Sequence, residues 1–412
     1  MFSSIFSTAP PVDPTAPNFH SVSSSVPENE LFGELEPKDT SLLCAGGFVT
    51  ETQTFYVITE DGTVWYPTIQ FTCKIANPSK GEKIWKSVNV NNFVTPPPGG
   101  YDKRSSKADE YSVLYKATAD PEYPEGYTIR ANLGNDLQIS LEVTRPASIP
   151  GYKVGKGPEG GYSYFGVDPK KADGYVIHRF WPRFKATGHI IRSGQAESIQ
   201  GSGMFVHAIQ GMRPNLVASA WNFAHFQSEE LGGVSAIQME FTTTETYGKK
   251  GSGSGGVVVN VGSLVIGNKL ATVTAETKWP GETSSGPVIS RAHHLKPEHD
   301  PDTSYQKPSE IEYQWKAPSV VPDAPGIVEA KLHVDLGTNE KHQGLIEKVD
   351  ILAEIPYVIK VAVNYVAGTK PYIYQWLNKT KLSITGPEAL APGLSSGVEV
   401  AGTLYNEATF IS

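Results

Sequence analysis

Three histidines and an aspartate lie close together in the second half of the chain, and these residue types are common metal ligands. They are His293, His294, His299 and Asp300. Zinc ligands usually follow short, regular spacings, and this group has no such spacing. Pro297 and Pro301 interrupt the segment, which favours an irregular, exposed loop. We therefore expect a solvated loop here and no bound metal.

Nucleophile motifs have only weak matches in this chain. Residues 251–255 read Gly-Ser-Gly-Ser-Gly, but a Gly/Ser-rich run makes a poor strained strand–turn–helix corner. The two cysteines, Cys44 and Cys73, lie in or beside apolar, strand-like sequence, where a thiol is not activated. No phosphate-binding or dinucleotide-binding glycine motif occupies a strand–turn–helix setting. The sequence thus predicts a protein that is not an enzyme and has no cofactor.

The densest aromatic and basic segment spans residues 178–183, His-Arg-Phe-Trp-Pro-Arg, and is followed by His189. One interpretation is a pocket mouth, at which Arg and His hold a polar head group while apolar walls hold a tail. The other interpretation is a buried Trp181, with Arg179 or Arg183 paired to carboxylates at the rim of a barrel. The sequence favours neither over the other.

The first residues offer a weak membrane contact. Phe2, Ile5 and Phe6 stand at the i, i+3 and i+4 positions of one short amphipathic turn, which suits a bilayer interface. The alternative is a frayed terminus. Residues 7–40 contain six prolines and a Ser-rich stretch, and this composition predicts a mobile leader or a loosely wrapped arm over residues 1–40.

Composition narrows the functional class. The formal net charge is −8, and no run of five Lys or Arg residues occurs, so nucleic-acid binding is not expected. Two cysteines in 412 residues favour a reducing compartment. The start of the chain lacks the basic and apolar regions of a signal peptide, and no stretch of 18 apolar residues occurs. These observations predict a soluble, cytoplasmic protein.

Short strand-like runs separated by turn signals follow one another from Gly46 onward. Asp61-Gly62 and Gly134-Asn135-Asp136 each separate two such runs, as in β-hairpins. A second series of the same kind begins near Trp221. Two series of strands in a chain of this length predict an all-β fold of two tandem antiparallel barrels, over residues 41–218 and 219–412. Short helices are predicted over residues 212–220 and 355–367.

Several longer segments closely resemble the fungal survival factor 1 family. The match runs in order over about residues 40 to 385 and includes the segments 180–183 (FWPR), 203–214 (GMFVHAIQGMRP), 220–228 (AWNFAHFQS), 239–243 (MEFTT), 353–356 (AEIP) and 368–375 (GTKPYIYQ). The family is described as tandem lipocalin-like domains, distantly related to carotenoid hydratase-like and some fungal cyclase proteins.

The resemblance implies ceramide binding, non-vesicular transfer from the endoplasmic reticulum to the Golgi, and a part in survival of oxidative stress. It also implies transient contact with both membranes, through an N-terminal amphipathic helix, and a cytoplasmic location with the nucleus as a further compartment. Here the leader is short and is soon broken by Pro10 and Pro11.

We predict that aromatic and polar side chains of these segments line the lipid pocket or the domain junction. The predicted lipid-binding residues are Arg179, Trp181, Arg183, Phe205, His207, Trp221, Phe223 and Tyr374. On this hypothesis Trp181→Ala and Phe223→Ala weaken lipid loading without unfolding the protein. Two other functions stay open: a hydratase or pericyclase acting on a hydrophobic polyene, and a stress-response scaffold without a ligand.

Overall fold

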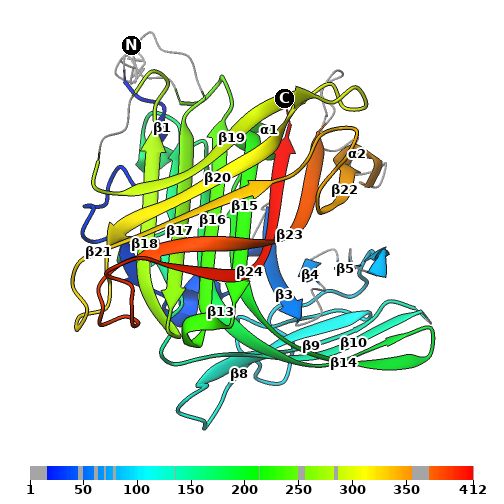
Figure 1. Ribbon diagram of the computed structural model, residues 1–412. Coiled ribbons are helices and arrows are strands. Elements are labelled where there is room, and N and C mark those ends of the chain that lie inside the picture. Colours follow the sequence, from blue (N-terminus) through cyan, green and yellow to red (C-terminus); the bar gives the residue numbers. More distant parts are fainter. Residues whose placement is uncertain are drawn as a thin grey trace, which may run out of the picture.

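A computed structural model describes residues 16–44, 50–59, 64–68, 71–77, 80–134, 136–212, 214–248, 256–282, 286–354 and 371–411. It confirms the predicted all-β class, with two tandem, strongly curled antiparallel sheets of the lipocalin-like type (Figure 1). The first sheet contains β1 to β14 and the second contains β15 to β24.

The strands of the first sheet are β1 (Phe19–His20), β2 (Phe32–Glu34), β3 (Thr50–Thr59), β4 (Val64–Thr68), β5 (Thr72–Asn77), β6 (Glu82–Ser87), β7 (Ser106–Lys107), β8 (Tyr111–Ala117), β9 (Glu125–Asn132), β10 (Leu137–Arg145), β11 (Tyr152–Val154), β12 (Tyr162–Phe165), β13 (Gly174–Arg192) and β14 (Gln195–Gln210). Those of the second sheet are β15 (Ala218–Ser228), β16 (Val234–Thr243), β17 (Val258–Ile266), β18 (Lys269–Lys278), β19 (Ile289–His299), β20 (Gln306–Pro318), β21 (Ile327–Asp335), β22 (Leu345–Asp350), β23 (Tyr372–Thr385) and β24 (Val398–Phe410).

Helical elements of the described residues are short. They are α1 (Pro214–Val217), α2 (Ile351–Glu354) and the 3₁₀ turns η1 (Pro37–Thr40), η4 (Pro169–Lys171) and η5 (Glu230–Gly232). α1 falls within the helix predicted over 212–220, although β15 already begins at Ala218. The helix predicted over 355–367 lies outside the described residues.

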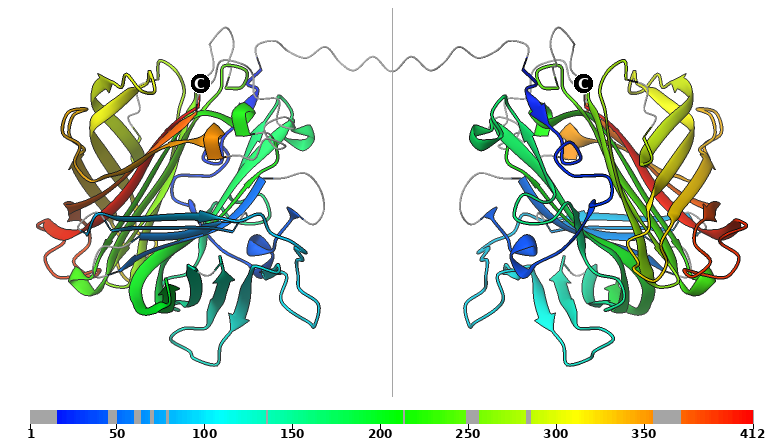
Figure 2. Two further views of the ribbon diagram at one scale, coloured as in Figure 1. Left: turned by 90° about the vertical axis from the view of Figure 1, so that its right-hand side faces the viewer. Right: turned by 90° about the vertical axis from the view of Figure 1, so that its left-hand side faces the viewer.

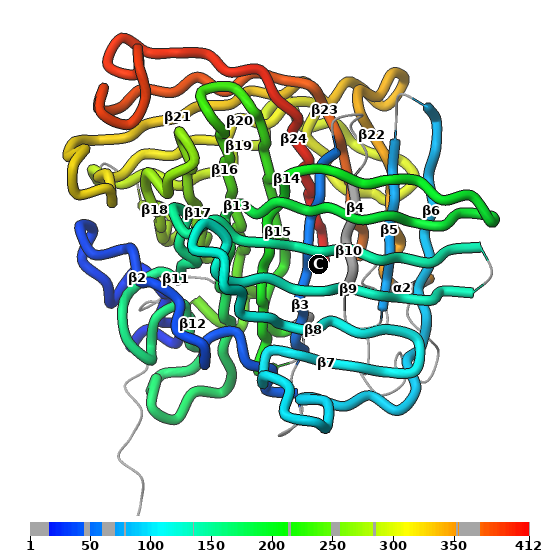
Figure 3. The backbone as a smooth tube through the Cα atoms, turned by 90° about the horizontal axis from the view of Figure 1, so that it is seen from below, coloured from blue at the N-terminus to red at the C-terminus, as the bar shows by residue number. Residues whose placement is uncertain are grey.

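The first sheet runs in the order β6-β5-β4-β3-β14-β13-β10-β9-β8-β7. Seen from below, β7 to β10, β13 and β14 lie side by side, and β4 to β6 cross them (Figure 3). The apolar side chains between these two parts form one core, in which the Phe71 and Tyr111 rings lie 5.0 Å apart. We call this space the first interior. Alternation of apolar and polar residues along β10 turns Leu137, Ile139 and Leu141 into it.

The second sheet runs in the order β18-β17-β16-β15-β24-β23-β21-β20-β19. β15 to β18 stand upright, and β19 to β21 cross them on one side (Figure 1). The space that these strands enclose, which we call the second interior, holds its own core around Trp315, Tyr374 and Trp376.

Two strand assignments differ from the sequence prediction. The histidine segment predicted as a solvated loop is strand β19, which pairs with β20 along its length. Pro297 is tolerated because β19 is the last strand of its sheet, and Pro297 faces Pro308 across the pair. The long strands β13 and β14, of 19 and 16 residues, are absent from the sequence prediction, which treats this region only as a motif.

Residues 16–40 form an arm along the line where the two sheets meet (Figure 2). Within it β1 pairs with β12, and β2 pairs with β11. Phe19, Val22 and Leu31 of this arm are 1%, 5% and 4% exposed. Of the two alternatives for the leader, this part therefore forms a wrapped arm that contributes to the core.

Candidate functional site

The two sheets meet through one apolar face each, and we call this contact the junction. The first sheet contributes residues such as Tyr152, Phe180 and Val206, and the second contributes residues such as Phe223 and Phe241. Because side chains alternate along a strand, β15 to β17 turn one set of residues to the junction and the other set into the second interior. The junction is thus a continuous apolar core shared by both domains.

Aromatic rings dominate the junction. Tyr56 of β3 lies 4.7 Å from Phe223 and 5.7 Å from Tyr405, ring centre to ring centre. Nearer the arm, the Trp221 ring lies 5.3 Å from Phe241. Phe19 of the arm completes this group, 6.2 Å from Phe241. Such pairs add to the burial of apolar area, so the arm is anchored by the same rings that hold the sheets together.

A few polar contacts also hold the arm in place. The backbone N–H of Val22 donates to Ser163 Oγ at 3.0 Å. Ser23 Oγ lies 2.5 Å from Thr277 Oγ1, which donates to Ser21 Oγ at 2.7 Å. Hydroxyl contacts at a partly exposed edge are worth little each, so the arm can leave β18 without breaking an ion pair at this point.

Two spaces adjoin the arm at the junction. A groove of about 710 Å³ lies between arm residues 23–31 and the β18–β19 region, residues 275–288. A closed cavity of about 10 Å³ lies next to it, lined by Val22, Val154, His178 and Phe241 among others. The closed cavity has room for about one water, whereas the groove is of the size that takes an organic ligand. Val22 lines the small cavity and Ser23 lines the groove, so the arm borders both spaces.

A third space opens at another edge of the junction. It measures about 420 Å³ and is lined by polar residues of both sheets, including Ser202, Glu229 and Lys379. Beside it, Arg183 Nη2 donates to Glu229 Oε1 at 2.6 Å and to Ser202 Oγ at 3.1 Å. Burial lowers the pKa of Arg183, and Glu229 opposes this shift.

Two buried histidines keep the junction uncharged. Burial lowers the pKa of His178 to about 4, and the ring stands edge-on to Trp221 at 5.9 Å. Burial, and then the nearby Arg183, lower the pKa of His225 to about 3. Both rings are therefore neutral at pH 7, and the wall beside the arm carries polar atoms without net charge.

The predicted lipid-binding aromatics divide between two places. Trp221 and Phe223 lie at the junction, as described above. Trp181 and Phe205 point instead into the first interior, where their rings lie 5.3 Å apart and are 2% and 0% exposed. The strand alternation explains this division, because Phe180 and Val206 occupy the junction face of the same strands.

The predicted basic residues pair with acids. Arg179 Nη2 lies 3.5 Å from Asp39 Oδ1, and Lys153 Nζ donates to Asp39 Oδ2 at 2.8 Å. His207 Nε2 lies 2.6 Å from Glu51 Oε1, with both side chains fully buried. This cluster ties η1 of the arm to β13 and β14. With the Arg183–Glu229 pair, it fits the interpretation of a buried Trp181 flanked by paired arginines.

Hydrogen bonding to Glu51 is extensive. Burial alone would raise the pKa of this carboxyl, but bonds from His207 and from the backbone N–H groups of Leu43 and Cys44 hold it below its ordinary value. The carboxylate therefore stays charged in the interior.

The last predicted lipid contact, Tyr374, lies in the second interior. Its hydroxyl donates to Asp300 Oδ2 at 2.8 Å and lies 2.5 Å from Thr303 Oγ1. It is thus remote from the junction aromatics. The predicted membrane contacts Phe2, Ile5 and Phe6 lie outside the described residues.

A polar network in the second interior has no counterpart among the sequence-predicted sites. Glu240 Oε1 accepts from Asn222 Nδ2 at 2.7 Å, and Glu240 Oε2 accepts from Asn260 Nδ2 at 2.9 Å. Asn222 Oδ1 lies 2.7 Å from His294 Nε2. Burial raises the pKa of Glu240, despite these hydrogen bonds. In the sequence, Glu240 alternates with the apolar Phe241, a pattern typical of a solvent-exposed position. The sequence does not reveal that β19 and β20 enclose this face of β16, so it gives no sign that Glu240 is buried.

Near this network, Asn406 and Tyr313 are fully buried. The Asn406 side chain interacts with the Tyr313 hydroxyl, and this contact opposes the rise in the pKa of Tyr313 that burial causes. The second interior therefore contains a second buried polar contact beside the Glu240 network.

Metal and membrane-spanning features were sought over the same described ranges. No group of three or more His, Cys, Asp or Glu side chains in them is arranged to hold a metal ion. His293 and His294 point to opposite faces of β19, as neighbours in a strand must. None of the described helices is long and apolar enough to cross a membrane.

Comparison with known proteins places the chain in a family. A family model of the Svf1 family matches residues 2–412. The chain belongs to the Svf1 family. This agrees with the resemblance drawn from the motifs, and the match extends it over nearly the whole sequence.

Curated relatives cover most of the chain. The ceramide-binding protein svf1 of Schizosaccharomyces pombe is 31% identical over 406 residues, which are 95% of this chain and 93% of the relative. The ceramide-binding protein svf1 of Aspergillus fumigatus is 34% identical over 391 residues, 88% of this chain and 86% of the relative.

Solved structures support the fold. The crystal structure of CghA matches with a TM-score of 0.58 over 96% of this chain and 98% of that one, at 12% identity. CghA with Sch210972 matches with a TM-score of 0.55 at 11% identity. At this identity the likeness concerns the double-sheet architecture alone.

Proposed function

We propose that this protein binds ceramide, or a related long-chain sphingolipid, at the junction beneath the arm, and carries it without chemical change. The observation that carries the proposal is the apolar junction covered by the arm, and we propose that Phe19, Val22 and Leu31 act as its lid. The groove beside the lid combines hydroxyls, such as those of Ser23 and Thr277, with charged side chains and a few apolar ones, including Leu31. Ceramide also combines polar and apolar parts, since its hydroxyls and amide stand at one end of two hydrocarbon chains.

The energetics favour a carrier with an enclosed site. A two-chain lipid with ~30 methylenes costs on the order of 24 kcal/mol to expose to water, at ~0.8 kcal/mol per methylene. A junction that opens when the arm leaves would replace this exposure by contact with apolar side chains. The ceramide-binding names of the curated relatives support the choice of cargo.

The cellular role is part of the same proposal. We place the protein in the cytoplasm, in transient contact with the endoplasmic reticulum and the Golgi, where it transfers ceramide and supports survival of oxidative stress. The leader residues Phe2, Ile5 and Phe6, which precede the arm, are the proposed membrane contact. A membrane contact directly before the lid would couple docking to opening of the junction.

The direct test of binding is native mass spectrometry of the protein purified from its own type of cell, followed by lipid extraction. The proposal expects one ceramide or related lipid per chain. A protein that is empty, and that also takes up no added ceramide, would contradict it.

A reversible lock tests the location. Ser23→Cys with Thr277→Cys places two thiols where the hydroxyl oxygens are 2.5 Å apart, a spacing from which a disulfide can form. The oxidised, locked protein should not take up fluorescent ceramide, and reduction should restore uptake in the same sample. Oxidised wild-type protein, which keeps Cys44 and Cys73, is the control. Equal uptake by the locked and reduced forms would exclude the junction as the binding site.

An enzymatic function is the second candidate, and Glu240 is the observation that favours it. A buried carboxyl with a raised pKa can serve as a general acid, and Asn222 and Asn260 orient it. A hydratase or pericyclase acting on a hydrophobic polyene would use such a group in the second interior. Conversion of an added polyene that is lost in Glu240→Gln would favour this candidate over the carrier.

A further inference from the structure

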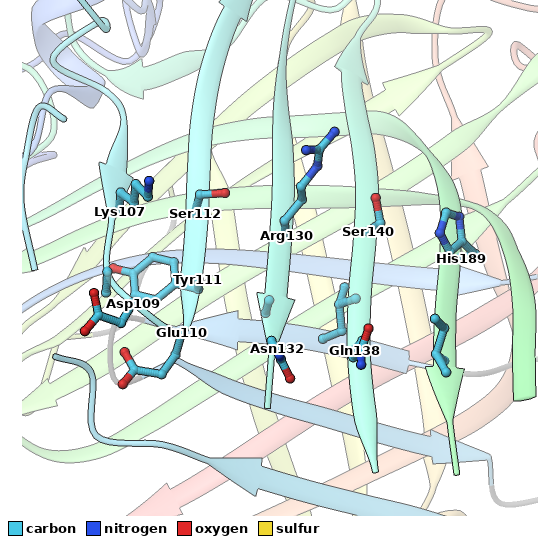
Figure 4. A pocket seen from close by; sticks show the side chains of 14 residues that line it. Lys107, Asp109, Glu110, Tyr111, Ser112, Arg130, Asn132, Gln138, Ser140 and His189 are labelled. Carbon is cyan, nitrogen blue, oxygen red and sulfur yellow. The ribbon is translucent and has the colours of Figure 1, made fainter. Parts of the chain in front are cut away.

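Side chains of seven residues line up across neighbouring strands on the outer face of the first sheet. The strand pairing places them directly opposite one another in the order Val94, Lys107, Ser112, Arg130, Ser140, His189 and Ser198. Residues directly opposite one another in antiparallel strands project to the same face. We call these seven residues the cation row. Figure 4 shows its central part, from Lys107 of β7 to His189 of β13.

The cation row faces away from the first interior. Its strand neighbours Tyr111, Ile129 and Ile139 are buried in that core, whereas Lys107 and Arg130 are exposed. In the described part of the chain, no carboxylate forms an ion pair with the Lys107 ammonium or the Arg130 guanidinium. Both positive charges are therefore free to attract an anion from solution.

The row lines an open pocket of about 310 Å³ (Figure 4). Arg130 lies in the middle of the row, flanked on the two neighbouring strands by Ser112 and Ser140. Neighbouring strands are about 4.8 Å apart, so both hydroxyls are within reach of an anion held by the guanidinium. Arginine and hydroxyl donors in this arrangement suit the oxygens of a phosphate group.

Exposed apolar side chains stand at one end of the row. Val94 pairs with Lys107 through two backbone hydrogen bonds and is 39% exposed. Tyr101, in the same loop, is 47% exposed. Exposed apolar side chains beside cations are typical of surfaces that dock on membranes, where tyrosine sits at the level of the head groups.

Two acids line the same end of the pocket. Glu110 accepts hydrogen bonds from the Asn91 backbone N–H at 2.9 Å and from Asn91 Nδ2 at 2.6 Å. Asp109 accepts from Asn92 Nδ2 at 2.8 Å. The negative charges of these two acids repel an anion from the turn between β7 and β8. An anion in this pocket would therefore bind more favourably beside Arg130.

We propose that the cation row is a docking site for the phosphate monoester head group of an anionic phospholipid at a membrane surface. Arg130 and the flanking serines hold the phosphate, Lys107 adds charge, and Val94 and Tyr101 contact the interface. The row is separate from the junction, so the proposal is independent of ceramide binding.

The test is flotation of the full-length protein with phosphatidylcholine vesicles that contain phosphatidic acid or, in parallel, phosphatidylserine. Wild-type protein should prefer phosphatidic acid. Arg130→Glu should weaken this binding roughly thirtyfold and Arg130→Gln about fivefold, since each cation near an anionic surface adds about one fivefold step. Ser112→Ala with Ser140→Ala should reduce binding to phosphatidic acid and leave phosphatidylserine binding unchanged, because the net charge is the same.

Lys331→Glu is the matched charge reversal, on the outer face of the second sheet, where Lys331 is 56% exposed. It should leave vesicle binding unchanged, and all variants should keep the thermal unfolding midpoint and ceramide content of wild type. Wild-type affinity in Arg130→Glu would overturn the proposal, as would an equal loss in Lys331→Glu. Binding of glycerol phosphate without binding of vesicles would also overturn it, in favour of a soluble ligand.

Discussion

The first and second interiors are built on the same plan of curled antiparallel strands, yet they are filled in opposite ways. The first is packed with rings: Phe55 to Phe205 at 4.7 Å, and Tyr127 to Trp181 at 5.1 Å. The second holds, at one end, the Glu240 network and the buried side chains of Asn406 and Tyr313. The first interior thus fixes the shape of its domain. The junction between the two interiors is also filled, mainly by aromatic rings, and the cavity beside Val22 measures only about 10 Å³.

The largest expected effect concerns the first interior. Trp181→Ala should lower the free energy of unfolding by about 3–5 kcal/mol, because it removes a fully buried ring from a filled core. Urea unfolding followed by circular dichroism measures this change. Trp221→Ala, at the half-buried junction position, is the comparison and should cost clearly less. Full ceramide uptake by the folded Trp181→Ala protein would show that Trp181 lies outside the binding site. A small loss of stability combined with lost uptake would instead show that Trp181 belongs to the binding site.

The second expected effect is a loss of stability in mild acid. Burial lowers the pKa of His294, in the second interior, to about 4, against about 6.5 in an unfolded chain. Between these values the unfolded state binds more protons, so the free energy of unfolding falls as the pH falls from about 6.5 to about 4. A fully buried group would contribute about 3 kcal/mol, and because His294 is only partly covered we expect about half of that.

Unfolding curves at several pH values test this prediction. His294→Gln should reduce the pH dependence without removing it, because His178 and His225 act in the same direction. His333→Gln, at an exposed ring on β21, should leave the pH dependence unchanged. An unchanged slope in His294→Gln would mean that the loss arises elsewhere, with His178 and His225 of the junction as the next candidates.

The smallest effect concerns Glu240. Because burial raises its pKa, the folded state keeps this proton at pH values where the unfolded state has lost it. Stability therefore falls as the pH rises from about 4.5 through the raised pKa. Glu240→Gln, which cannot ionise, should match or exceed the wild-type stability at pH 7 by about 1 kcal/mol.

Chemical unfolding at pH 5 and at pH 7 measures the sign of the stability difference between Glu240→Gln and wild type. Both pH values lie above the pKa of about 4.3 that a glutamate has in an unfolded chain. Glu399→Gln, an exposed carboxyl on β24, is the control and should change nothing. A clear destabilisation by Glu240→Gln at pH 7 would show that the ionised carboxylate is the stable form, and would weaken the proposed general acid.

Sequence patterns predict much of the fold. Alternation and turn residues locate the hairpins β3–β4, β9–β10 and β15–β16, since these carry their own local signals. Alternation does not identify β13 as a strand, because its side chains contribute to two different cores. Phe180 faces the junction and Trp181 the first interior, and the pairing then shifts register before Phe184. Both faces are buried there, so no alternation is visible.

The site is less predictable because it depends on contacts between distant segments. Sequence places Trp221 and Phe223 among the candidate contacts, but nothing local distinguishes them from Trp181. The arm shows the same difficulty: its prolines and serines indicate loose chain, and only the partners supplied by β12, β16 and β18 explain why Phe19 and Val22 are buried.

The arm also has a consequence for the order of synthesis. Ser23 and Thr277 are 254 residues apart, so the arm leaves the ribosome long before the β18 residues that it contacts. At ~5–20 residues per second this interval is about 13–50 s, and such long-range contacts form slowly. During it the nascent chain presents an apolar wall with no cover. The nascent protein therefore exposes the most apolar surface before its synthesis is complete. A lipid or a chaperone that binds at this stage meets a junction that the arm does not yet cover.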